Sequence, residues 1–317
     1  MSKRLEYIDN AKAILIFMVV LAHVLNYANP GYDILPYTLT QAFITSFHMP
    51  AFFLITGMLF KNEKWREQSW GAFLISRLRS LMIPYLFFET LAILYLHFVL
   101  HSVTLTEGLY RMVTFRCNVG ADWFLPAMFL ANVLYFVTVK YPSRYLWPVV
   151  AAVCFFCTWI LPNGHWWHVL CRGLLGFGFI YLGNRAKQWI SMDKMSNAVI
   201  AFFLTVVFSA LSLRYFSNDF FNCVVKNPPL FAACGLTGLY FILSVSRRIR
   251  WKWLRLVGEN TLPIMGTHQL VLYTVPSSNS PVWVIGMILL IAAVELVFVF
   301  LANKTCPLLI GKKKRNA

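Results

Sequence analysis

Apolar residues recur along the whole chain in long runs, and short segments rich in Lys, Arg, Asn and Pro separate them. A helix of about 20 apolar residues crosses the ~30 Å hydrocarbon core of a bilayer. The pattern therefore predicts an all-α, polytopic integral membrane protein with about ten transmembrane helices, because that many apolar runs reach this length. The expected spans are residues 9–27, 38–60, 81–101, 122–139, 145–161, 167–184, 197–214, 228–245, 259–275 and 281–303. No stretch is left for a soluble domain, so we expect residues 1–317 to form a single membrane-embedded domain.

Composition and charge agree with this reading. The chain is 59% hydrophobic and only 13% charged, against about 25% charged residues in soluble domains. The net charge of +16 could suggest a nucleic-acid partner. Most Lys and Arg residues, however, fall in alternate loops between the expected spans, which is the positive-inside pattern. The charge thus predicts topology, with both termini cytoplasmic and no nucleic-acid binding, in a multi-pass protein of the cell (plasma) membrane.

Ionisable residues inside a span are costly and indicate function. Lys12 and His23 lie eleven residues apart in the first span. This spacing puts them on nearly the same helix face, ~16 Å apart along the axis. In one interpretation, Lys12 extends to the inner membrane interface and His23 lies among the outer lipid headgroups. In the other, both side chains line a polar cavity. His48 is expected at the depth of His23, as a packed residue or a site residue, and His268 is expected in mid-membrane.

Other polar positions carry weaker signals. Arg77 and Arg79 at the cytoplasmic mouth of a span are either topology signals or phosphate ligands, because guanidinium pairs bidentately with phosphate. Trp123 is expected at the outer face, where Trp is usually an interfacial residue. Glu259 begins the span over residues 259–275. No third ligand accompanies His97 and His101, so we expect no metal site.

Five short motifs, taken in order, resemble the integral-membrane acyltransferase 3 family, and within it the fucose 4-O-acetylase-like branch. They are Lys12 with His23 in "YIDNAKAILIFMVVLAH", "FHMPAFFLITG" at 47–57, Arg77 and Arg79 ahead of Pro84 and Tyr85, "WFL" at 123–125, and "GENTLPIMGTH" at 258–268. Some members carry an acid a few residues after the "W-L" motif, whereas residues 127–130 are apolar here.

The resemblance implies an O-acetyltransferase that moves an acetyl group from cytoplasmic acetyl-CoA to a hydroxyl of a glycan or another sugar-containing acceptor. It implies His23 as general base, since neutral imidazole can take the hydroxyl proton near physiological pH. Lys12, Arg77 and Arg79 would contact the donor. The acceptor side would be shaped by His48, Trp123, His268 and Glu259.

Several alternatives stay open at this point. Transfer could be direct or pass through a transient acyl-histidine. A glycolipid or small-solute transporter would also need polar residues at the midplane, and a membrane-embedded partner domain without catalysis is a further reading. The order of the motifs favours the enzyme. The acceptor's identity and the oligomeric state, a homodimer included, are not determined by the sequence.

Overall fold

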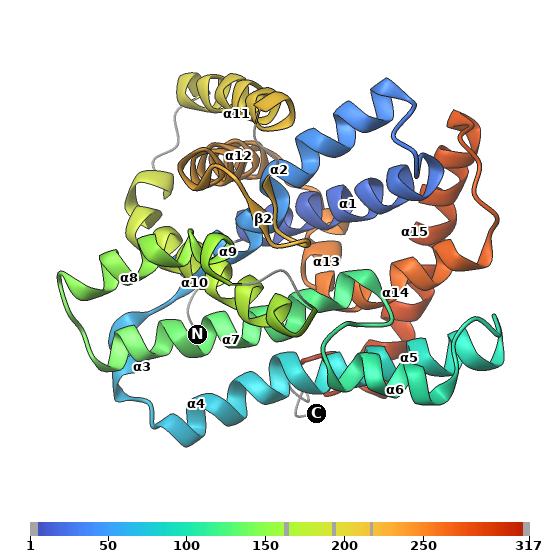
Figure 1. The fold of residues 1–317 in the computed structure, drawn as a ribbon, viewed down its shortest axis with the longest axis horizontal. Helices are drawn as coiled ribbons and strands as arrows, with labels where there is room; N and C mark the ends of the chain where they lie inside the picture. Colours follow the sequence, from blue (N-terminus) through green and yellow to red (C-terminus); the bar gives the residue numbers. More distant parts are fainter. Residues whose placement is uncertain (1–5, 162–164, 192–194, 216–217, 313–317) are drawn as a thin grey trace. The chain divides into compact units, whose positions relative to one another are not determined.

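The computed structural model describes residues 6–161, 165–191, 195–215 and 218–312, and these are almost entirely helical (Figure 1). The helices of the first half are α1 (Glu6–Ala28), α2 (Leu35–Leu59), α3 (Asn62–Glu67), α4 (Trp70–Arg77), α5 (Ile83–Phe98), α6 (Leu105–Val113) and α7 (Phe124–Lys140). Those of the second half are α8 (Leu146–Cys154), α9 (Cys157–Ile160), α10 (His165–Ser191), α11 (Met195–Tyr215), α12 (Pro228–Arg248), α13 (Lys252–Gly258), α14 (Thr261–Thr274) and α15 (Pro281–Thr305). Two short antiparallel strands, β1 (Asn218–Asp219) and β2 (Val224–Val225), pair Asn218 with Val225 and Asp219 with Val224.

Seven helical segments among the described residues are long and apolar enough to cross a membrane, judged by length and composition. They are Glu6–Ala28, Leu35–Leu59, Trp70–Phe98, Gly120–Lys140, Met195–Arg214, Pro228–Arg248 and Pro281–Thr305. The protein is therefore a multi-pass, helical membrane protein. The count of ten spans and the cytoplasmic termini stay predictions. Over residues 145–161 the structure has two short helices, α8 and α9, instead of one continuous span, and α14 has 14 residues.

The segment Trp70–Phe98 contains a π-helical turn, Leu78–Met82, between α4 and α5. Pro84 follows this turn and has no backbone N–H, so the carbonyl of Ser80 loses its usual helical donor. A local widening of the helix accommodates such a missing bond. The turn places Arg79 in an irregular stretch at the start of the apolar segment.

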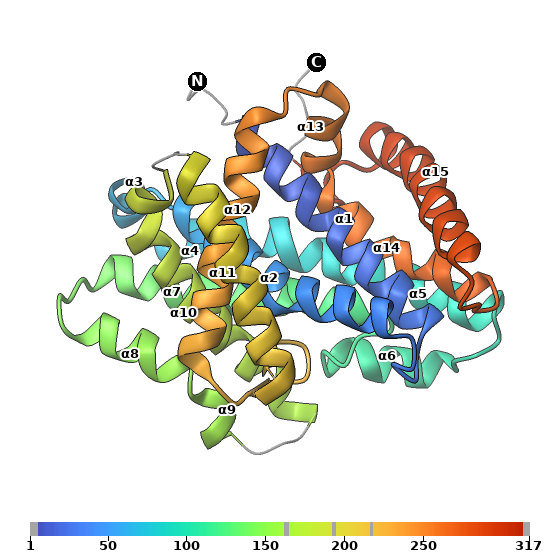
Figure 2. The same ribbon diagram turned by 90° about the horizontal axis from the view of Figure 1, so that it is seen from above.

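The chain divides into two compact units. Unit 1 comprises Met1–Val19, Leu39–Gln68 and Leu130–Thr261. Within it α11 and α12 lie side by side, as Figures 1 and 2 both show. The backbones of α2 and α10 touch at two glycines: a Cβ on Gly57 would lie 2.0 Å from the carbonyl oxygen of Ile180, and one on Gly183 would lie 2.2 Å from that of Leu54. Small residues allow this close helix packing in membranes.

Unit 2 comprises Val20–Thr38, Ser69–Phe129 and Leu262–Ala317. Its core includes Val24 and Leu25 of α1, packed with Leu272 of α14 and with Met287 and Ile291 of α15. The other side of α15 is exposed and apolar.

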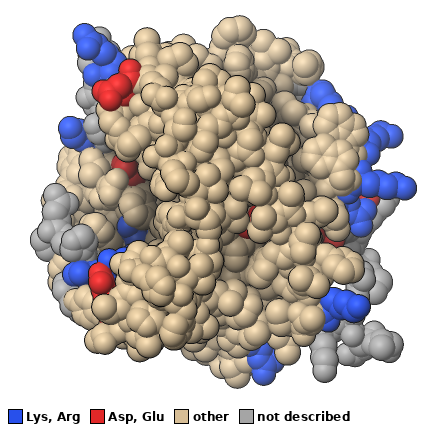
Figure 3. Space-filling model, turned by 90° about the vertical axis from the view of Figure 1, so that its right-hand side faces the viewer, with Lys and Arg blue, Asp and Glu red and all other residues tan. Residues whose placement is uncertain are grey.

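That exposed side includes Val282, Leu296 and Phe300, which are 77%, 67% and 67% exposed. Figure 3, viewed from the right-hand side of Figure 1, shows a face with few charged side chains across most of its area. Such a surface suits contact with lipid acyl chains, because apolar side chains lose no hydrogen bonds there.

Candidate active site

Two histidines of unit 2 that are far apart in the sequence lie next to each other. His23 of α1 and His268 of α14 have ring centroids 5.2 Å apart, with the rings tilted by 47°. His268 is fully buried, whereas His23 is half-buried. The sequence placed both inside the membrane; the fold of unit 2 brings them together.

Gln269 determines the hydrogen-bonding state of His23. Its Oε1 accepts a hydrogen bond from the backbone N–H of Ala121 at 2.9 Å. Because that backbone group can only donate, the amide orientation is set, and the Nε2 group of Gln269 faces Nδ1 of His23 at 2.7 Å. Nδ1 must then accept the hydrogen bond, so the neutral His23 ring carries its hydrogen on Nε2.

His268 has the opposite tautomer for a similar reason. Its Nδ1 lies 2.8 Å from the carbonyl oxygen of Ile264, one helical turn earlier. A carbonyl only accepts, so Nδ1 of His268 carries the hydrogen and donates it. Nε2 is left with a lone pair, and it is buried without a hydrogen-bond partner among the described residues. The two rings thus offer complementary groups: an N–H on His23 and a basic nitrogen on His268.

A buried carboxyl cluster supports the turn that holds Gln269. Glu89 of α5 is fully buried and accepts hydrogen bonds from the backbone N–H of Asn118 (2.9 Å) and from its side-chain amide (2.7 Å). Asp122 of the 3₁₀ turn Gly120–Trp123 is also fully buried, and neither of its carboxyl oxygens has a hydrogen-bond partner among the described residues. Glu89 also accepts from the backbone N–H of Val119 at 3.5 Å. These contacts tie α5 to the chain directly before the 3₁₀ turn, which contains Ala121.

α14 has a second buried polar anchor. The hydroxyl of Thr267 donates to Oε1 of Glu295 on α15 at 2.8 Å, and Glu295 is 4% exposed. Thr267 directly precedes His268, so this contact helps to hold the histidine-bearing turn of α14 against α15.

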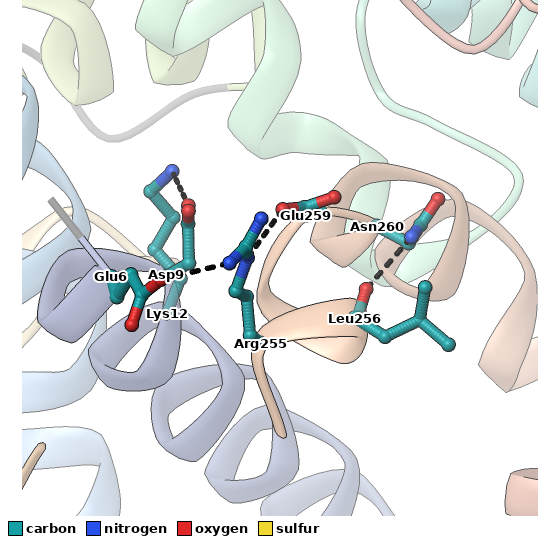
Figure 4. A network of polar contacts seen from close by, with 7 residues as sticks. All are labelled: Glu6, Asp9, Lys12, Arg255, Leu256, Glu259 and Asn260. Carbon is teal, nitrogen blue, oxygen red and sulfur yellow. Dashed lines mark hydrogen bonds and ion pairs between the residues drawn. The ribbon is translucent and has the colours of Figure 1, made fainter. Parts of the chain in front are cut away.

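The other charged cluster belongs to unit 1 and is shown in Figure 4. Lys12 forms an ion pair with Asp9 at 3.2 Å. Arg255 of α13 bonds both Glu6 of α1 (2.9 Å) and Glu259 (3.1 Å). The expected donor residue Lys12 and the expected acceptor residue Glu259 therefore both belong to this cluster.

Close backbone packing accounts for the glycine of the "GENTLPIMGTH" motif. A Cβ on Gly258 would lie 1.8 Å from the backbone oxygen of Asp9. Asn10, the next residue, donates from its side chain to the carbonyl of Ile249 at 2.8 Å. The start of α1 is thus held directly against the segment that includes α13.

The remaining predicted site residues are placed as follows. His48 of α2 is buried in unit 1 and bonds the carbonyl of Ile44 through Nδ1 at 2.8 Å. Trp123 of unit 2 is only 5% exposed, so it is a packed residue and not the interfacial one that Trp usually is at this position. Arg77 ends α4 with its guanidinium 5.8 Å from the ring of Phe73, and Arg79 is exposed.

Sequence reasoning missed Gln269 and Asn118. A search for ionisable residues inside spans passes over amides, although Gln269 directly follows His268. It also missed a cavity of about 510 Å³ in unit 1 that is lined by Arg66, Arg144 and Arg185. Those arginines had been explained by topology alone.

These features define a class: a multi-pass helical membrane protein with two neighbouring histidine rings, one fully buried and one half-buried. Residues 5–302 match the family model described as an acyltransferase domain, Acyl_transf_3. The chain belongs to this acyltransferase family. Comparison with curated proteins and with solved structures gave no match. The family supports membrane acyltransferase activity, while the fucose 4-O-acetylase-like branch stays a prediction.

Proposed function

We propose that this protein is a membrane O-acetyltransferase that transfers an acetyl group from acetyl-CoA to a hydroxyl of a glycan or another sugar-containing acceptor. The observation that carries the proposal is the pair His23 and His268, whose ring centroids lie 5.2 Å apart. One ring offers an N–H and the other a basic nitrogen. Acyl transfer from a thioester to an alcohol needs these two groups at the reacting centre.

The chemistry uses both rings. The acceptor hydroxyl attacks the thioester carbonyl carbon, a C–O bond forms and the C–S bond breaks. The hydroxyl proton passes to a ring nitrogen and then to the departing sulfur, which leaves as the thiol of CoA. The family resemblance implied that His23 removes the proton. The hydrogen bond from Gln269 to Nδ1 of His23 favours a division of labour. Nε2–H of the half-buried His23 donates to the oxygen or sulfur on which charge develops. The acceptor hydroxyl must reach the buried Nε2 of His268, which then accepts the proton.

The same two groups serve a direct transfer and a route through an acyl-histidine, so the proposal covers both. On the donor side we retain Lys12, Arg77 and Arg79 as expected contacts of acetyl-CoA. On the acceptor side we retain His48, Trp123 and Glu259. The plasma membrane is the proposed location, because the family and the apolar helices support a multi-pass membrane enzyme.

The test uses the full chain purified in nanodiscs. Acetyl-CoA is titrated against the wild type, His23→Ala and His268→Ala, and both binding and CoA release are followed with a panel of sugars. We expect all three proteins to bind acetyl-CoA and only the wild type to release CoA at an appreciable, acceptor-dependent rate. If none of them binds acetyl-CoA or releases CoA, the acetyltransferase proposal fails and solute flux in proteoliposomes becomes the measurement of choice.

A further inference from the structure

A cavity of about 510 Å³ lies within unit 1. It is formed by α3, the last turns of α7, the loop over residues 141–145, the start of α8 and the second half of α10. Its volume falls in the ~300–1,000 Å³ range of small-molecule sites. None of its lining residues belongs to the histidine site described above.

The charge of this cavity is strongly positive. Arg66, Arg144 and Arg185 line it, and no Asp or Glu does. None of the three arginines forms an ion pair with a carboxylate in the described part of the chain. All three arginines are exposed at the mouth of the cavity. Three guanidinium groups at one mouth with no carboxylate beside them favour an anionic ligand, because guanidinium pairs bidentately with phosphate and carboxylate.

The floor of the cavity is held in place by a chain of polar contacts. The hydroxyl of Tyr135 donates to Oδ1 of Asn62 at 3.1 Å, and Nδ2 of Asn62 donates to Oδ1 of Asn184 at 3.2 Å. The Nδ2 of Asn184 in turn donates to the carbonyl of Gly57 at 3.0 Å. Tyr135 and Asn184 are 2% and 7% exposed, so the floor is a preformed part of the fold and not a surface groove between mobile side chains.

The cationic rim is also partly positioned. Arg185 donates from Nε and Nη2 to the hydroxyl of Tyr181 at 3.2 and 3.1 Å. The ammonium of Lys140 donates to the backbone carbonyl of Arg66 at 2.6 Å and so ties α3 to the end of α7.

Aromatic side chains complete the lining. Tyr135, Tyr181 and Trp147 all line the cavity. The indole N–H of Trp147 donates to the carbonyl of Tyr141 at 2.6 Å, which orients its ring. A cavity that offers several guanidinium groups together with aromatic faces matches a ligand with several phosphates and a flat base.

We propose that this cavity binds the nucleotide end of the acyl donor, that is, the adenine and phosphate groups of coenzyme A. The choice of coenzyme A rests on the proposed function, whereas the cavity itself indicates a nucleotide with more than one phosphate. A phospholipid headgroup would share the phosphate chemistry, but it carries no base to match the rings of Tyr181 and Trp147. The arginines also belong to the loops that the charge pattern places on the cytoplasmic side, where CoA is found.

The binding test compares CoA, ADP and pantetheine on the full chain in phosphatidylcholine nanodiscs. The variants are the double change Arg66→Gln/Arg144→Gln and the single change Arg185→Gln. The matched control for the single change is Arg250→Gln, since Arg250 is an exposed arginine of unit 1 outside the cavity and its change removes the same single charge. We expect the double variant to raise the Kd of both CoA and ADP by about tenfold or more, because each guanidinium–phosphate contact is charge-assisted. Pantetheine binding should stay unchanged in every protein.

Two results would overturn the inference. In the first, the Kd of CoA and ADP is unchanged in both cavity variants, while Arg77→Gln or Arg79→Gln weakens CoA binding. This result would assign the nucleotide to Arg77 and Arg79. The other result has two parts: the wild type does not bind ADP, and phosphatidylglycerol that co-purifies with the wild type is lost from the double variant. This result would make the cavity a lipid headgroup site. Acetyl transfer is measured in parallel with acetyl-CoA and acetyl-pantetheine. If no protein transfers acetyl but ADP binding still depends on the arginines, the proposed function fails and the nucleotide site stands.

Discussion

Nε2 of Gln269 lies 2.7 Å from Nδ1 of His23, and the backbone N–H of Ala121 determines which end of the amide faces the ring. A single rigid donor in the 3₁₀ turn therefore sets the tautomer of a histidine on α1. The orientation of an amide or imidazole group is assigned from its hydrogen-bond partners. Here the backbone N–H of Ala121 can only donate, so it sets the orientation of the Gln269 amide and, through it, the tautomer of His23.

The first prediction concerns Gln269. Gln269→Met keeps the length of the side chain but removes both hydrogen bonds, so the His23 ring loses its tautomer preference. We expect kcat for acetyl transfer to fall roughly 10- to 100-fold with an unchanged KM for acetyl-CoA, less than the ~10²–10⁴ that a general acid–base group contributes. Gln269→Glu should also be impaired, because a carboxylate accepts from Nδ1 and reverses the tautomer.

Nitrogen-15 spectra of histidine-labelled protein check the physical cause directly. In the wild type, His23 should show hydrogen on Nε2 and His268 should show hydrogen on Nδ1. In Gln269→Glu the His23 signals should move to those of an Nδ1–H ring. A wild-type spectrum with Nδ1 of His23 protonated would contradict the tautomer assignment, whatever the activity of the variants.

The second prediction separates the histidine pair from the other histidines of the chain. His268→Ala and His23→Ala should each lower kcat by about 10²–10⁴-fold and leave the Kd of acetyl-CoA within a factor of two or so. His101→Asn is the matched control, because His101 has a positive φ of 50°, which Asn tolerates. Equal activity of His268→Ala and wild type would remove His268 from the chemistry and return proton removal to His23.

The third prediction tests the donor role expected for Lys12. Lys12→Ala should raise the KM for acetyl-CoA, while Lys12→Arg should retain most of the donor affinity. We expect Lys12→Ala to fold, because the Lys12 side chain is 26% exposed, but to unfold at a lower temperature, because its partner Asp9 is 4% exposed and loses a counter-charge. Thermal unfolding and acetyl-CoA titration of the three proteins give the two readouts. An unchanged KM in a folded Lys12→Ala protein would count against the donor role.

The fourth prediction concerns the motif glycine Gly258. In Gly258→Ala the new Cβ would collide with the backbone of Asp9 at 1.8 Å, so α1 and α13 must move apart. We expect a loss of about 1–3 kcal/mol in stability, seen as a lower unfolding temperature in detergent.

Gly286→Ala provides the control for Gly258→Ala. Gly286 is also helical, and a Cβ there would meet nothing within 4 Å. The extra methyl should stabilise α15 by roughly 0.5–1 kcal/mol. A Gly258→Ala protein as stable as Gly286→Ala would show that the close contact with Asp9 is absent in solution.

Much of the secondary structure could be predicted from the sequence, because a run of apolar residues long enough to cross a bilayer has few alternatives to a helix. The expected spans over residues 9–27, 38–60 and 281–303 correspond to α1, α2 and α15. The expected span over residues 145–161 does not form one helix, since the chain turns between α8 and α9 at residues 155 and 156. Hydropathy measures the cost of burial, and it does not reveal such an interruption within an apolar stretch.

The sequence by itself determined that this is a helical membrane protein, that Lys12 and His23 share one helix, and that the motifs resemble an acyltransferase family. These conclusions follow from local quantities: hydropathy, residue spacing and motif order. The tertiary structure alone decided that His268 is the neighbour of His23, that Gln269 sets the His23 tautomer, and that arginines of α3, α10 and the loop over residues 141–145 line one cavity. Those relationships join residues up to 246 positions apart, as for His23 and Gln269, and depend on how helices pack, which no local pattern encodes.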